Sequence, residues 1–166
     1  MIKVEHLSRY FPLFKDKIVV DIGCNAGVIS EMIAKYAEKV FGIEKDKEIL
    51  DYSDTVEWIV KLRRRNVKYI NSTIGEFLKK NYDFNASWCS NALYYFSNEE
   101  IELIGKKLFP KCDLIIFVSY EPKPDLGNND KFLSKWQNIE AWLKEHGFKT
   151  EVKDKELKWV TIIGKR

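Results

Sequence analysis

The chain has 166 residues, and its 28 lysines and arginines nearly balance its 25 aspartates and glutamates. This length suits one domain with a sizeable core and excludes two domains of ordinary size. The charge balance by itself indicates neither a nucleic acid nor a membrane surface as a partner, so we expect one domain over residues 1–166.

The cysteines and the hydropathy narrow the class of protein. Cys24, Cys89 and Cys112 have no paired spacing with histidines and lie in or beside predicted strands, which favours free buried thiols over disulfides or a metal site. No uncharged apolar run approaches the ~18 residues of a membrane span. We therefore expect a soluble, cytoplasmic protein without a metal or a membrane partner, and the sequence indicates no oligomeric state.

The N-terminal segment is predicted to be helical. Val4, Leu7 and Phe11 recur at helical spacing before Pro12. A short helix within residues 1–15 should cover the edge of the sheet or the site. His6 lies in it, and a partly exposed histidine is a commoner role there than a catalytic one.

The stretch Lys17–Ser30 is typical of a strand, a glycine turn and a helix. An apolar run over 18–20 ends at Asp21, whose carboxylate can accept bonds from an amine or a hydroxyl, or favour a cation. Gly23 and Gly27 leave room for a ligand beside the backbone, and the first helical turn favours an anionic group there. The next apolar residues share the spacing of one buried helix face: Ile29, Met32, Ile33 and Tyr36.

A second acidic residue follows at the distance typical of a βαβ unit. Lys39–Ile43 is predicted to be a strand, and Glu44 follows it about 20 residues after the glycines, where an acid binds ribose hydroxyls. A dinucleotide fingerprint needs Gly-x-Gly-x-x-Gly and a P-loop needs Gly-Lys-Ser/Thr, whereas residues 23–27 are Gly-Cys-Asn-Ala-Gly. The ligand should therefore contain a ribose, and a nicotinamide dinucleotide is disfavoured.

With Asp21 two residues before Gly23, this turn resembles the first motif, Asp-x-Gly-x-x-x-Gly, of the class I S-adenosylmethionine (SAM) dependent methyltransferases. The resemblance runs from about Ile18 to the C-terminus and implies a Rossmann-like α/β fold. That fold is a three-layer αβα sandwich with a seven-stranded, mostly parallel sheet in the order 3-2-1-4-5-7-6 and an antiparallel last strand. The implied cofactor is SAM, with S-adenosylhomocysteine (SAH) as product. The expected cofactor-binding residues are Asp21, Gly23, Cys24, Asn25, Gly27, Glu44, Ser72, Thr73, Ser90 and Asn91.

The segment after Glu44 is predicted to hold a long helix over Lys47–Arg65. Its basic end, 61–65, has two alternatives, contact with phosphates or a solvated helix end. Val67–Ile70 is predicted to be the third strand. In the family, the segment after this strand usually carries an acid that reaches the adenine amine, but residues 71–73 are Asn-Ser-Thr. Ser72 or a backbone group can substitute, or Ser72 or Thr73 forms a capping box with Glu76.

Ala86–Ser90 is predicted to be the fourth strand, and residues 91–96 resemble the family's fourth motif, at the crevice beside the first strand. The two prolines typical of enzymes that methylate exocyclic amines of nucleic-acid bases are missing here, which disfavours that reaction. Of Tyr94 and Tyr95, we expect one in the site and one in the core.

The remaining elements complete the alternation of strands and helices. Ser97–Glu100 has the form of a helix start, and Cys112–Tyr120 is the most hydrophobic strand. The following loop, Pro122–Asn129, should frame the acceptor. Three elements are then expected: a helix over Lys131–His146 and an antiparallel hairpin of Phe148–Val152 and Trp159–Ile163.

The resemblance also implies a mechanism. A sulfonium methyl is activated by its own charge, so the enzyme mainly holds donor and acceptor in line, an effect worth about 7–11 kcal/mol. A hydroxyl acceptor also needs a base, for which Glu121, His6 and Tyr94 are the candidates by position. We expect a small-molecule or sugar acceptor; the alternatives are an RNA or protein substrate in an open crevice, or a non-catalytic SAM-binding adaptor.

Overall fold

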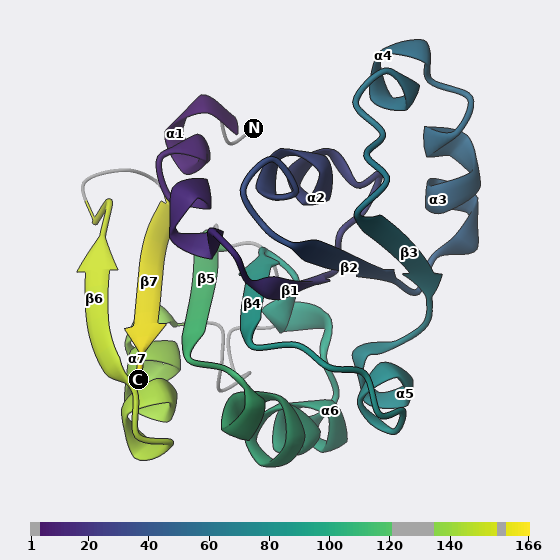
Figure 1. The fold of residues 1–166 in the computed structure, drawn as a ribbon. Coiled ribbons are helices and arrows are strands. Elements are labelled where there is room, and N and C mark those ends of the chain that lie inside the picture. Colours follow the sequence, from purple (N-terminus) through teal and green to yellow (C-terminus); the bar gives the residue numbers. More distant parts are fainter. Residues whose placement is uncertain (1–3, 121–134, 156–158) are drawn as a thin grey trace.

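The computed structural model describes residues 4–120, 135–155 and 159–166. Within them the chain forms a seven-stranded sheet in the order β3-β2-β1-β4-β5-β7-β6, which confirms the predicted order (Figure 1). Strands β1 to β5 run parallel, and β7 is antiparallel to both β5 and β6, as predicted. The strands are β1 (Ile18–Ile22), β2 (Lys39–Glu44), β3 (Val67–Asn71), β4 (Ala86–Ser90), β5 (Leu114–Tyr120), β6 (Lys149–Lys153) and β7 (Trp159–Lys165).

Helices cover both faces of this sheet and complete the predicted three layers. Figure 1 shows α1 and α2 on one face and α5, α6 and α7 on the other. The helices are α1 (Val4–Ser8), α2 (Val28–Ile33), α3 (Lys47–Ser53), α4 (Glu57–Val60), α5 (Ile74–Leu78), α6 (Asn98–Leu103) and α7 (Trp136–Glu145). Shorter helical turns lie at Phe11–Phe14, Leu93–Tyr95, Ile104–Leu108 and Phe109–Lys111.

The sheet is buried on both sides because successive strand residues point to opposite faces. In β1, Val19 packs in the layer of α1 and α2, whereas Val20 packs in the layer of α5 and α7. The three cysteines are buried free thiols, as predicted. No helix in the described residues is long and apolar enough to cross a membrane, and no cluster of metal-ligating side chains occurs among them.

The predicted helix over Lys47–Arg65 is wrong in its length. The chain forms α3, leaves helical geometry at Val56, and resumes with the single turn of α4. Ser53 donates its hydroxyl to the carbonyl of Leu50, and Thr55 donates to that of Tyr52. Such side-chain bonds to the backbone compete with helix propagation, which explains the break.

Two smaller expectations also change. The buried residues of α2 and the turn after it are Ser30, Glu31, Ile33, Ala34 and Ala37, whereas Tyr36 is 42% exposed. The helix ends at Ile33, so the predicted helical spacing ends one turn before Tyr36.

The N-terminal segment splits into α1 and a turn whose Phe11 and Phe14 pack on Trp88, in the middle of the sheet. It therefore covers a face of the sheet.

Candidate functional site

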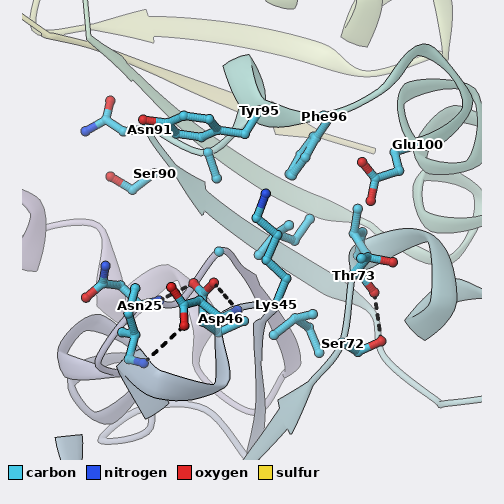
Figure 2. Close-up of a pocket in the computed structure, with 17 residues that line it drawn as sticks. Asn25, Lys45, Asp46, Ser72, Thr73, Ser90, Asn91, Tyr95, Phe96 and Glu100 are labelled. Carbon is cyan, nitrogen blue, oxygen red and sulfur yellow. Dashed lines mark hydrogen bonds between the residues drawn. The ribbon is translucent and has the colours of Figure 1, made fainter. Parts of the chain in front are cut away.

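A cavity of about 580 Å³ opens at the carboxyl ends of β1, β2, β3 and β4 (Figure 2). The strand order reverses between β1 and β4, and ligands of open α/β sheets bind at such a switch point. The volume lies in the range of small-molecule sites. Seven of the predicted cofactor-binding residues line this cavity: Gly23, Asn25, Glu44, Ser72, Thr73, Ser90 and Asn91.

Glu44 connects two backbone segments at the cavity by hydrogen bonds. Its carboxylate accepts a hydrogen bond from the backbone N–H of Asn25 at 3.0 Å and another from that of Asp46 at 3.0 Å. These bonds join the turn after β1 to the start of α3. A carboxylate has about four lone-pair sites, so each oxygen keeps capacity for a ligand hydroxyl.

Asp21 lies behind the turn and does not line the cavity. Its side chain is 2% exposed and accepts a hydrogen bond of 2.5 Å from the hydroxyl of Ser30 in α2. Burial raises the pKa of Asp21 to about 7, against the lowering effect of the Ser30 bond, and the charge of Glu44 adds to the increase. Asp21 therefore contributes to the packing of the turn against α2 and does not contact the cavity. Cys24 is likewise buried and does not line the cavity.

The two glycines of the turn have different surroundings. Both have a positive φ, +71° at Gly23 and +82° at Gly27. A Cβ at Gly23 would lie 2.6 Å from the Cβ of Ala92, at the edge of the cavity. A Cβ at Gly27 would lie 2.2 Å from the hydroxyl oxygen of Tyr69. The space beside Gly27 is thus filled by Tyr69. Gly27 was predicted to contact the ligand, but it does not line the cavity.

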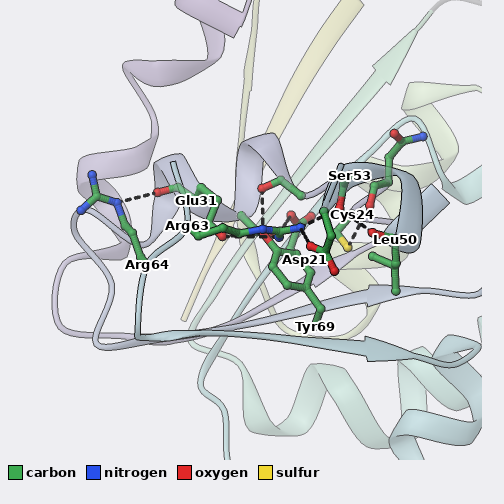
Figure 3. A network of polar contacts seen from close by, with 12 residues as sticks. Asp21, Cys24, Glu31, Leu50, Ser53, Arg63, Arg64 and Tyr69 are labelled. Atoms are coloured by element: carbon green, nitrogen blue, oxygen red, sulfur yellow. Dashed lines mark hydrogen bonds and ion pairs between the residues drawn. The ribbon is translucent and has the colours of Figure 1, made fainter. Parts of the chain in front are cut away.

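A buried polar network supports Gly27 from the side away from the cavity (Figure 3). The Tyr69 hydroxyl lies 2.7 Å from the carboxylate of Glu31 and 3.1 Å from the carbonyl of Gly27. Glu31 is 1% exposed, and burial raises its pKa, although Tyr69 and two arginines oppose this change. Arg63 lies 3.7 Å from that carboxylate and stacks 4.3 Å from the ring centre of Tyr69.

The same network corrects the prediction for one residue of the basic run 61–65, Arg63, whereas Lys61, Arg64 and Arg65 are exposed. Arg63 also pairs with Asp54 at 2.6 Å, and Arg64 donates to the carbonyl of Glu31 at 3.2 Å. Arg63 is therefore a structural cation that faces a buried acid, and neither predicted alternative describes it. Sequence spacing does not reveal this role, because Glu31 and Arg63 meet only through the packing of α2 against the segment after α4.

Of the tyrosine pair after β4, Tyr95 lies at the cavity as predicted, whereas Tyr94 is only half-buried and does not belong to the core. Asn91 has a φ of +56°, and the Tyr94 hydroxyl donates to its side-chain oxygen at 3.2 Å. Tyr94 is half-buried and does not line the cavity, whereas Tyr95 lines it and is 72% exposed. The two rings lie edge to face, with their centres 6.3 Å apart, and only that of Tyr95 belongs to the lining of the cavity. The prediction of Tyr94 as a catalytic candidate is not supported by this position.

The other two candidate bases lie elsewhere. His6 is exposed on α1, with its ring centre 6.0 Å from that of Trp159, and it does not line the cavity. Glu121 and the loop Pro122–Asn129 lie outside the described residues.

Capping boxes hold the two helices beside the cavity. Thr73 caps α5 reciprocally with Glu76, which confirms the predicted capping box. Ser97 caps α6 reciprocally with Glu100. Glu100 also lines the cavity together with Lys45 and Phe96, and these contacts were missed at the sequence level. The helix start at Ser97 was the only signal for Glu100, and it did not reveal which way that side chain faces.

No family model and no curated protein sequence matches the chain. Solved structures do match it. Magnesium protoporphyrin IX methyltransferase from Synechocystis PCC 6803, with bound SAM, has a TM-score of 0.70 at 15% identity over 98% of this chain and 77% of that one. Precorrin-6y C5,15-methyltransferase from Geobacter metallireducens GS-15 has a TM-score of 0.70 at 17% identity over 100% of this chain and 90% of that one.

A SAM-dependent methyltransferase from Aquifex aeolicus has a TM-score of 0.69 at 18% identity, over 96% of this chain and 87% of that one. The chain has the class I methyltransferase fold. Identities this low show the fold alone. The named acceptors of the matched proteins differ from one another, so the matches do not indicate the acceptor of this chain.

Proposed function

We propose that this protein is a methyltransferase that takes its methyl group from SAM and releases SAH. The observation that carries the proposal is the position of Glu44, which lies at the switch-point cavity and holds the turn Gly23–Asn25. An acid at this place in a βαβ unit binds ribose hydroxyls. The turn lacks the third glycine of a dinucleotide site, which favours SAM over NAD.

The chemistry of the lining residues fits SAM. Glu44 keeps lone pairs for ribose hydroxyls beyond its two backbone bonds. Three apolar side chains offer a surface for a flat base: Ile49, Ile74 and Phe96. Asn25 and Ser90 lie on the opposite side of the cavity from Thr73 (Figure 2) and offer polar groups to the amino-acid part.

When bound, SAM supplies a methyl group that is activated by the sulfonium charge. The protein then has to hold an acceptor in line with that methyl group. Asn91 and Tyr95, after β4, lie where they can contact an acceptor. A neutral amine acceptor needs no base, whereas a hydroxyl acceptor needs one, and Glu121 stays a candidate for that role.

For the acceptor we propose the hydroxyl or amine of a small molecule or a sugar. The charge balance does not by itself indicate a nucleic acid, so a small molecule or a sugar is the first class to test. An RNA or protein acceptor and a non-catalytic SAM-binding role are the alternatives. Methyl transfer from labelled SAM to pools of sugars, metabolites, RNA and protein distinguishes them, because an adaptor binds SAM and labels none of these pools.

The donor site is tested by calorimetry of the purified protein against SAM, SAH and NAD. We expect micromolar binding of SAM and SAH and no binding of NAD. Replacing Glu44 with Ala should weaken SAM binding at least about tenfold, because the ribose loses its acceptor. Glu48→Ala, on the exposed part of α3, is the control and should bind like the wild type. Binding of NAD alone, or equal SAM affinity in Glu44→Ala, would contradict the proposal.

A further inference from the structure

Glu100 presents a carboxylate oxygen to the cavity that the fold itself does not use. Its Oε2 accepts the backbone N–H of Ser97 at 3.1 Å, as part of the capping box of α6. Among the described residues Oε1 makes no hydrogen bond. It lies beside the start of α5, where a Cβ at Gly75 would be 3.8 Å away. The side chain is therefore held by one oxygen and presents the other.

The other acidic residues at the cavity also accept backbone N–H groups. Within the described lining these are Glu44, whose oxygens each accept a backbone N–H, and Asp46, whose side chain caps α3 by accepting from Glu48 and Ile49. Ser72 donates its hydroxyl to the carbonyl of Thr73 at 2.9 Å. Oδ2 of Asp46 and Oε1 of Glu100 are thus the carboxylate oxygens of the lining that make no hydrogen bond among the described residues. In Figure 2 Asp46 lies beside Asn25, whereas Glu100 lies on the side of Thr73.

The position of Glu100 matches the base end of a nucleoside. Figure 2 shows its carboxylate on the same side as Thr73 and across the cavity from Asn25 and Ser90. Phe96 lies on this side as well, so a base carried by a ribose at Glu44 meets an aromatic ring when it points this way. A carboxylate there can only accept hydrogen bonds.

We infer that Glu100 selects the base of the cofactor by accepting a hydrogen bond from the exocyclic amine of adenine. This inference rests on the proposed function and extends it to a specificity-determining residue on α6. Adenine carries an amino donor at this edge, whereas hypoxanthine carries a carbonyl acceptor. Two acceptors facing each other repel, so the site should reject an inosyl ligand.

The test compares SAH with S-inosylhomocysteine, in which a carbonyl replaces the adenine amine, by calorimetry. The wild type should bind SAH about tenfold to a hundredfold more tightly. Glu100→Gln keeps the capping box, because its amide oxygen still accepts from Ser97, and it turns an NH₂ donor toward the cavity. The preference for SAH should then disappear or reverse.

Glu76→Gln is the matched control, because Glu76 has the same place in the capping box of α5 and does not line the cavity. It should keep the wild-type preference. Glu100→Ala provides a second variant, which should bind the two ligands about equally. Thermal unfolding of each variant shows that it is folded.

The outcomes separate the two proposals. If the wild type binds neither SAM nor SAH, the proposed function fails and this inference fails with it. If the wild type prefers SAH and both Glu100 variants keep the same ratio, the inference is overturned while the SAM site stands. Loss of the preference in both Glu100 variants, with the ratio unchanged in Glu76→Gln, supports it.

Discussion

Asp21 is a carboxylate that the fold buries behind the glycine turn, with the Ser30 hydroxyl as its hydrogen-bond donor. Desolvation favours the protonated form, so the pKa of Asp21 rises from 3.8 to about 7. In the folded state Asp21 therefore holds a proton over a pH range in which the unfolded chain has lost it. By linkage, the free energy of unfolding falls as pH rises from about 4 to about 7.

Asp21→Asn should remove this contribution, because an amide does not titrate and still accepts from Ser30. Relative to the wild type, the variant should have a similar free energy of unfolding at pH 4. At pH 8 it should be more stable by an amount on the order of 4 kcal/mol. Urea unfolding of both proteins between pH 4 and 8 measures this difference. Asp51→Asn, at an exposed acid, is the control, and a difference that stays constant with pH would contradict the prediction.

At the scale of elements, the break between α3 and α4 brings a cation to a buried acid. The short turn of α4 lets the chain pass beside α2, where Arg63 meets Glu31 and covers the ring of Tyr69. Tyr69 in turn lies against the backbone of Gly27. The segment after α4 thus supports the glycine turn from behind, although it lies far from that turn in the sequence.

Arg63→Ala should destabilise the protein by about 1–3 kcal/mol, because it leaves the carboxylate of Glu31 buried without that cation. The double variant Arg63→Ala, Glu31→Gln should lose less than the sum of the two single changes. Urea denaturation measures all three. Arg65→Ala, at an exposed position of the same run, is the control and should change stability by no more than about 0.5 kcal/mol. If Arg63→Ala and Arg65→Ala lowered the free energy of unfolding by the same amount, the structural role of Arg63 would be contradicted.

At the scale of the whole molecule, one sheet separates two apolar layers. Phe14, 0% exposed, lies in the layer of α1 and α2, and Phe77, 1% exposed, lies in the layer of α5 and α7. Alternate residues of the same central strands contribute to both layers. Because the two layers share these strands, neither can lose its packing while the other keeps an intact sheet.

We therefore expect a single cooperative unfolding transition. Phe14→Ala and Phe77→Ala should each lower the free energy of unfolding by about 3–5 kcal/mol. In each variant the whole transition should shift, with far-ultraviolet circular dichroism and tryptophan fluorescence giving the same midpoint. Leu13→Ala, at a residue that is 37% exposed, is the control and should change the midpoint little. Separate midpoints for the two probes would show that the layers unfold independently.

The sequence by itself determined the strands, the capping box with Glu76, the helix start at Ser97 and the class of the fold. These features depend on local patterns: apolar runs such as Ile18–Val20, a capping residue three positions before a glutamate, and the alternation of strands and helices. Local patterns can be recognised without knowing which residues pack together in the fold. The place of Glu44 at the cavity could also be predicted, since the carboxyl ends of parallel strands meet at one edge.

Only the tertiary structure decided which side chains face the cavity and which support it from behind. Asp21 and Gly27 stand in the motif but lie beneath the turn, against Ser30 and Tyr69. Tyr95 lines the site where Tyr94 was the candidate, and Glu100 reaches the cavity from a helix whose sequence shows only a cap. These directions depend on how helices pack on the sheet, which brings together residues that no spacing along the chain connects.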